Sequence, residues 1–214
     1  MKKSFTITLV FCLLFAQYLF AQKQMRYKHD QDGTFSIGIR SGLSFENSAD
    51  GINMSQGLGM QFRIMPTKRI NTEWFAESFH GSYGALGVRT DTHIGALALL
   101  YPQRRMQRVA PFLAIGPNAD FIKIRDRLNK NNFESRWCIG AQAGIGFHIN
   151  MTYRFDMTLS TQYMLHFGQP VALQLNDGNI IYLPHGGSVL DGHLLFNISF
   201  NYKMADLWKK LKFH

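Results

Sequence analysis

The sequence has little cysteine. Its 214 residues include two cysteines, Cys12 inside an apolar N-terminal stretch and Cys138 alone in the remainder. A single cysteine cannot form an intramolecular disulfide, so the remainder of the chain must gain its stability from an extensive fold. The residues before Cys12 also lack the small-residue lipobox, which argues against a lipoprotein.

Long apolar runs are missing beyond the N-terminal stretch. A membrane helix needs about 20 consecutive apolar residues, and charged, polar or glycine residues interrupt every later candidate. The sequence therefore predicts a mature protein without a helical membrane anchor.

Motifs of common catalytic and cofactor sites are also missing. There is no glycine-rich phosphate loop, CxxC pair, HExxH motif or nucleophile elbow. The formal charge of +9 is not accompanied by the aromatic and basic motifs of nucleic-acid binding. We therefore expect no enzyme activity, no cofactor, no metal and no nucleic-acid partner.

The N-terminus has the pattern of a secretory signal peptide. Lys2 and Lys3 precede an uncharged, mostly apolar run that ends at Ala21, and this pattern predicts Sec-dependent export. The expected organisation is a signal peptide at 1–21, an N-terminal periplasmic segment at 22–33, a β-barrel at 34–204 and a basic tail at 205–214. Without the signal peptide the charge falls to +7, which suits anionic lipid head groups or plain solubility.

Alternation of apolar and polar residues is the strongest pattern in the chain, and a period of two indicates β-strands. The third segment alternates less regularly, and the fourth is apolar on both faces. In the fifth, Pro111 and Pro117 require bulges or strand ends. The eight expected strands are 35–45, 58–65, 70–79, 92–101, 109–122, 137–149, 155–165 and 193–202.

The connections between these segments alternate in length. Segments 66–69, 102–108 and 150–154 are short, whereas 46–56, 80–89, 123–135 and 168–192 are long. This layout is typical of an outer-membrane barrel with tight periplasmic turns and longer outer loops. The predicted fold is all-β, a closed antiparallel up-and-down transmembrane β-barrel of about eight strands. The longest connection is expected to form either a hairpin, with strands at 172–175 and 179–183, or an ordered cap.

The polar face decides which side meets water. A soluble ligand-binding barrel carries many Lys and Glu outside, but this polar face consists mostly of Gly, Ser, Asn and Gln, which suit a narrow interior. We therefore expect the apolar face to meet lipid, with aromatic residues at the two membrane interfaces. The expected interface aromatics are Phe35, Phe45, Trp74, Tyr101, Trp137, Phe155 and Tyr202.

Several charged residues share the inward phase of the expected strands. They could form a path for protons or ions, or a plug of paired charges. We favour the plug because charges in a narrow closed interior must be paired. The expected interior residues are Arg40, Arg63, Glu73, Glu77, Asp120, Arg136, His148 and Asp156.

Four segments carry a family resemblance: FSIGIRSGLSF, VAPFLAIGPNADF, AQAGIGFHI and LLFNISFNYKM. Together they resemble small outer-membrane β-barrel proteins of the OmpA/OmpX-like superfamily. The Gly116-Pro117 strand and a signal ending in Ala-Gln more specifically resemble the PorT-like group of the Bacteroidetes. Membership implies an eight-stranded barrel but no single activity; PorT itself is associated with a secretion and gliding apparatus.

The favoured function is a non-enzymatic structural or interaction role in the outer membrane. Its partners would be membrane lipid and a protein at the outer loops or periplasmic turns. An accessory role in a secretion or envelope complex is one form that this interaction could take. A soluble lipocalin-like barrel is one alternative, and a lipid-modifying enzyme is another. The enzyme would draw on residues in or beside the longest loop, namely His166, Asp177, His185, Ser188, Asp191 and His193. The tail at 205–214 is expected to be an interfacial helix or a frayed terminus.

Overall fold

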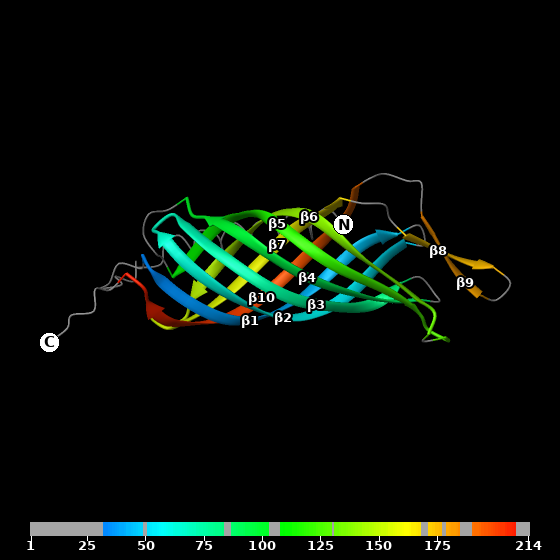
Figure 1. Ribbon diagram of the computed structural model, residues 1–214. Helices are drawn as coiled ribbons and strands as arrows, with labels where there is room; N and C mark the ends of the chain where they lie inside the picture. Colours follow the sequence, from blue (N-terminus) through cyan, green and yellow to red (C-terminus); the bar gives the residue numbers. More distant parts are fainter. Residues whose placement is uncertain are drawn as a thin grey trace, which may run out of the picture.

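The computed structural model describes residues 32–48, 51–83, 87–102, 108–129, 131–167, 171–176, 179–184 and 190–208. Its regular elements are strands (Figure 1). They are β1 (Thr34–Ser48), β2 (Gly51–Thr67), β3 (Ile70–Tyr83), β4 (Gly87–Leu100), β5 (Val109–Asp126), β6 (Phe133–Asn150), β7 (Phe155–Phe167), β8 (Val171–Asn176), β9 (Asn179–Pro184) and β10 (Leu190–Asp206). Among the described residues no helix is long and apolar enough to cross a membrane.

Eight of the strands close into one barrel. Their order around the barrel is β1-β10-β7-β6-β5-β4-β3-β2, and every neighbouring pair is antiparallel. Closure gives each strand two partners and leaves no sheet edge exposed. The predicted closed antiparallel up-and-down barrel of eight strands is confirmed.

The remaining strands, β8 and β9, form a separate two-stranded hairpin between β7 and β10. The hairpin projects from one end of the barrel, while the C-terminal end of β10 lies at the opposite end (Figure 1). Its strands include the predicted segments 172–175 and 179–183, so the hairpin expectation is confirmed.

The barrel strands are longer than the sequence pattern suggested. At the end that carries the β8–β9 hairpin, β1 continues to Ser48 and β2 begins at Gly51, where a loop at 46–56 was expected. The ladder between β5 and β6 likewise continues as far as Arg125 and Phe133. Cross-strand hydrogen bonds therefore continue into polar sequence, because a ladder needs backbone groups and not apolar side chains. At the other end the described turns after β2 and β6 lie within the predicted segments 66–69 and 150–154, whereas residues 103–107 of the third predicted turn lie outside the described residues.

The chain termini fall partly outside the described residues. The predicted signal peptide, residues 22–31 and residues 209–214 of the tail are outside them. At the C-terminal end β10 runs to Asp206, two residues past the predicted barrel boundary, and pairs with Thr34. The Leu207 backbone N–H then donates to the Gly33 carbonyl at 2.7 Å.

Side-chain alternation holds around the barrel, but one side of the interior is apolar. On β3, Trp74 is 48% exposed and its neighbour Phe75 is 4% exposed, which resolves the least regular predicted strand. On β4, which is apolar on both faces, the inward residues include Leu97 and Leu99. The interior apolar cluster comprises Met65, Phe75, Leu97, Leu99, Tyr101, Ala110, Phe112 and Ala114.

Pro117 lies in the middle of β5 without a register shift. It pairs with Ala141 on β6, and the β4–β5 register is the same on both sides of it, at Gly95↔Asn118 and Ala98↔Ile115. The expected bulge at this proline is therefore wrong. Pro111, near the start of β5, lies close to the expected strand end.

Close backbone approach makes Gly116 a sensitive position. A Cβ atom there would collide with the Ala96 carbonyl oxygen and with the Leu97 backbone, which cannot rotate away as a side chain can. We expect Gly116→Ala to destabilise the barrel by about 1–3 kcal/mol, measured by urea unfolding in detergent. The matched control is Gly192→Ala, whose Cβ would have its three nearest contacts with the Tyr163 side chain. Equal losses for the two variants would contradict the backbone explanation.

Candidate functional site

The polar interior of the barrel is the candidate site. Arg136 shares the inward phase but is only half-buried, because it lies near the β5–β6 end of the barrel. The other predicted interior residues are buried: Arg40, Arg63, Glu73, Glu77, Asp120, His148 and Asp156. The structure distributes them over three connected groups along the barrel.

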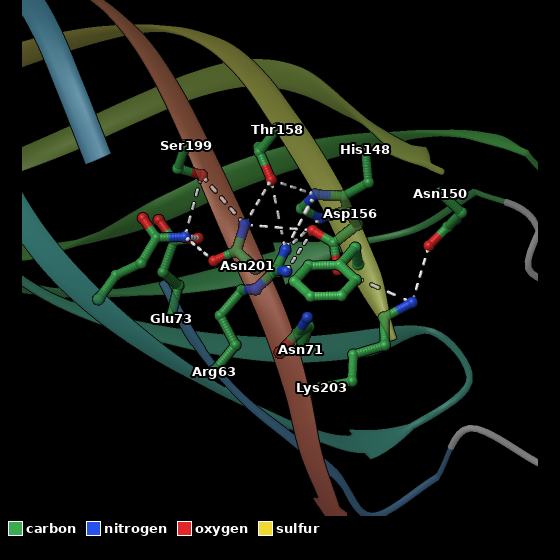
Figure 2. Close-up of polar contacts among 12 residues, drawn as sticks. Arg63, Asn71, Glu73, His148, Asn150, Asp156, Thr158, Ser199, Asn201 and Lys203 are labelled. Carbon is green, nitrogen blue, oxygen red and sulfur yellow. Dashed lines mark hydrogen bonds and ion pairs between the residues drawn. The ribbon is translucent and has the colours of Figure 1, made fainter. Parts of the chain in front are cut away.

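The first group lies near the short-turn end (Figure 2). Arg63 Nη2 donates to Asp156 Oδ1 at 2.5 Å, and Arg63 Nη1 lies 2.9 Å from His148 Nδ1. Asn201 Nδ2 donates to the same Asp156 oxygen at 3.1 Å. Lys203 Nζ lies 3.7 Å from the second Asp156 oxygen. This carboxylate therefore ties together β2, β7 and β10.

The second group is centred on Arg40. Its Nε lies 2.8 Å from Glu77 Oε2, and its Nη1 donates to Glu73 Oε1 at 3.2 Å. The guanidinium also lies 4.3 Å from the centre of the Phe75 ring, a favourable cation–π arrangement. Gln61 Nε2 donates to the other Glu73 oxygen at 3.1 Å. One buried cation thus pairs with two carboxylates on β3.

The third group lies toward the end that carries the longer hairpins, and sequence reasoning missed most of it. Arg89 pairs with Glu46 and, at 2.8 Å, with Asp91. His93, farther along β4, is fully buried. The sequence did contain a signal for this group. Arg89, Asp91 and His93 occupy every second position, in register with Gly95, and therefore share the inward face of β4. The expected loop at 80–89 hid this continuation of the strand.

Two histidines assigned to the neighbourhood of an outer loop are inside the barrel. His166 is 2% exposed and His193 is 0% exposed, and their ring centres are 4.7 Å apart. His193 Nδ1 lies 3.2 Å from Ser44 Oγ. His193 lies in the last barrel strand, as predicted, and on its inward face. His166 was expected just past the end of a strand at 165, but β7 extends to Phe167 and carries it inside the barrel. Asp177, His185, Ser188 and the side chain of Asp191 lie outside the described residues.

The predicted interface aromatics face outward, with one exception. Trp74, Trp137 and Phe155 are exposed, and Phe35, Phe45 and Tyr202 are half-exposed. Tyr101 is instead 6% exposed and lies inside the barrel, where its hydroxyl contacts His148 Nε2 at 2.8 Å. The prediction for Tyr101 is wrong because the second half of β4, the part next to Tyr101, is apolar on both faces and alternation there does not distinguish them.

Two hollows accompany these groups. A cavity of about 20 Å³ lies beside Arg63, Tyr101 and Lys203, which is room for about one water molecule. A larger hollow of about 850 Å³ lies against strands β1, β10, β7, β6 and β5. Its described lining has no titratable side chain, and it includes outward residues such as Leu43, Leu113 and Ile145. The described lining of the larger hollow is therefore mostly apolar and uncharged.

Comparison with known proteins supports the fold. No family model and no curated protein matches the chain. Among solved structures, the chain is similar to neisserial surface protein A (TM-score 0.57, 12% identity, 79% of this chain and 97% of that chain). It is also similar to a major outer membrane protein of Thermus thermophilus (0.54, 9%, 79% and 99%). A third similar structure is Ail, the attachment invasion locus protein of Yersinia pestis (0.53, 13%, 81% and 99%).

None of these likenesses tests the resemblance to the PorT-like group, which stays a prediction. At such low identity they speak for the arrangement of the backbone and not for a shared activity. The chain has the fold of small eight-stranded outer-membrane barrel proteins.

Proposed function

We propose that this protein is a non-enzymatic outer-membrane barrel that holds extended hairpins outside the membrane for contact with a partner. The observation that carries the proposal is the outward surface of the barrel. Large apolar side chains are exposed on each of its eight strands, among them Ile39 at 61%, Leu58 at 68% and Ile139 at 68%. A continuous apolar surface of this kind is stable against lipid and is a liability in water.

The height of the apolar surface fits a bilayer. The outward residues of β6 are apolar from Trp137 to Ile149. With a rise of about 3.3 Å per residue and a tilt of about 45°, this span is about 28 Å tall, close to the apolar band of roughly 25 Å in outer-membrane barrels. Beyond Trp137, the outward cross-strand pair is Lys123 with Ser135, which is polar. The Phe121–Trp137 ring pair, with centres 5.2 Å apart, therefore marks one membrane boundary.

The interior supports a structural role and not a channel. The charged groups described above are buried and paired, and the cavity at the short-turn end has room for about one water molecule. An eight-stranded barrel has an interior just wide enough for side chains. His166 and His193, two residues of the alternative lipid-modifying enzyme, are buried away from any lipid substrate.

The β5–β6 hairpin is the best described candidate contact surface. Near its tip Leu128 is 88% exposed, and Arg127 beside it is also exposed. On the same hairpin Lys123 Nζ lies 4.2 Å from the centre of the Phe133 ring. An exposed apolar residue among cations suits an anionic partner surface with an apolar spot. An accessory role in a secretion or envelope complex stays a prediction.

Heat-modifiability tests the proposal. Membranes from cells that produce the full chain are washed with carbonate and extracted in mild detergent, and boiled and unboiled samples are compared by gel electrophoresis. We expect the protein in the membrane fraction, with a mobility shift on boiling. Protease added to intact cells should cut the β5–β6 hairpin and leave the barrel whole. An unshifted protein in the aqueous fraction would contradict the lipid-facing surface.

A further inference from the structure

Three residues in and beside the third interior group have the composition of a metal site. His93 on β4, Asp120 on β5 and His166 on β7 each direct one potential ligand atom toward a common point, and these atoms lie within 4.8 Å of one another. The exposed fractions of the three residues are 0%, 0% and 2%. We propose that His93, Asp120 and His166 bind a divalent transition-metal ion inside the barrel, a site that goes beyond the proposed function.

Strand pairing brings the three residues together. His93 and Asp120 are directly opposite each other in the β4–β5 ladder, and His93 Nε2 lies 4.0 Å from Asp120 Oδ1. His166 reaches the other Asp120 oxygen across β6. It does so where β6 has Gly140, which pairs with His166 on one side and Asn118 on the other. A Cβ at this position would collide with the Leu165 carbonyl oxygen and with the side-chain amide of Asn118, which itself donates to Asp120.

Unused polar atoms are the second observation. Within the described part of the chain, neither ring nitrogen of His93 has a hydrogen-bond partner, and the same is true of Asp120 Oδ1 and His166 Nδ1. A buried polar atom without a partner costs about 1–3 kcal/mol, and such atoms are rare in folded proteins. Two of these atoms, His93 Nε2 and Asp120 Oδ1, face each other at 4.0 Å. A bound cation would accept a lone pair from each of them.

Neighbouring residues orient the three side chains in the manner of a metal site. Glu77 Oε1 lies 4.0 Å from His93 Nδ1 and leaves His93 Nε2 directed at Asp120. Metal-binding histidines usually donate their second ring N–H to such a carboxylate. Asn118 Nδ2 donates to Asp120, and the His193 ring packs edge-on against His166.

The surrounding charges are compatible with an added cation. Carboxylates outnumber the nearby guanidinium groups, since Arg40 is paired with both Glu73 and Glu77 and Arg89 with both Glu46 and Asp91. Two imidazoles and one carboxylate suit Zn²⁺ and related ions rather than Ca²⁺ or Mg²⁺. Tetrahedral Zn²⁺ needs ligand atoms about 3.4 Å apart, so the three side chains would rotate toward the ion and leave its fourth position for water. A bound ion would link β4, β5 and β7 across the interior.

Refolding with metal tests the site. The full chain is unfolded in urea with a chelator, refolded in detergent with or without Zn²⁺, and desalted. Bound zinc is then measured by plasma mass spectrometry. We expect about one ion per chain, and background zinc in His93→Ala and in His166→Gln. The exposed His80 provides the control, since His80→Ala should retain the ion. Glu77→Gln should weaken zinc binding about 10- to 100-fold.

A second readout keeps the result independent of folding. Refolding with Co²⁺ should produce the visible absorption of a low-symmetry cobalt site in the wild type and in His80→Ala. Variants that shift on boiling but lack this absorption fold without the metal, as the proposal expects. If the wild type, folded by the same criterion, holds no more zinc than His93→Ala, the site does not exist and His166–Asp120 is a plain ion pair.

Discussion

Replacing Arg40 by methionine is expected to destabilise the barrel by about 3–5 kcal/mol, because it leaves two carboxylates, Glu73 and Glu77, buried without their shared cation. Methionine keeps much of the apolar stem that packs near Phe75, so the main loss is charge. The measurement is equilibrium urea unfolding of the detergent-folded protein, followed by loss of the heat-modifiable band.

Two further variants separate this effect from lost packing. In the triple variant Arg40→Met, Glu73→Gln, Glu77→Gln no buried charge is unpaired, so most of the lost stability should return. Arg125→Met on the β5–β6 hairpin removes a half-exposed arginine and should change stability by no more than about 0.5 kcal/mol. A triple variant no more stable than the single one would show that the carboxylates do not cause the loss.

Replacing Ile145 by arginine is expected to destabilise the folded protein in lipid bilayers by about 2–4 kcal/mol. Ile145 points outward from the middle of β6 and is 63% exposed. In water, a substitution at such an exposed position would be close to neutral. The size of this effect therefore distinguishes a lipid-facing surface from a water-facing one. The measurement is urea unfolding in phospholipid vesicles.

Ser135→Arg is the matched control on the same strand and the same face. Ser135 is exposed and lies beyond Trp137, outside the proposed membrane boundary. Its replacement should cost about 0–1 kcal/mol. Equal costs at the two positions would place both in the same solvent and contradict the proposed membrane boundary at Trp137.

Alternation predicted the faces of a strand wherever its two faces differ in composition. On β6, Trp137, Ile139 and Ile145 alternate with glycines and polar residues, and the structure places them outside as expected. On β4 the inward Leu97 and the outward Leu100 are equally apolar. Composition therefore did not distinguish the two faces in the second half of this strand, and Tyr101 was assigned to the wrong face. In the first half, Arg89, Asp91 and His93 do mark the inward face.

The interior groups were predictable as a set but not as pairs. Phase alone indicated that Arg40, Glu73 and Glu77 face inward. Which cation meets which carboxylate depends on strand register and on which strands lie across the interior from each other. His166 illustrates this limit. It contacts Asp120 two strands away in the barrel, and neither the alternation nor the spacing of residues in the sequence predicts that contact.

Closure of the barrel through β1 and β10 has a kinetic consequence. Residues at the two ends of the barrel sequence are direct neighbours, as in Ile39↔Phe200 and Phe45↔Leu194. Contacts between positions so distant in sequence slow folding, because the loop-closure entropy is lost before the contact forms. Until β10 arrives, β1 and β7 each present an unpaired edge to other chains. The chain consequently depends on its last strand to escape aggregation, and holding it unfolded until that strand is available would favour productive assembly.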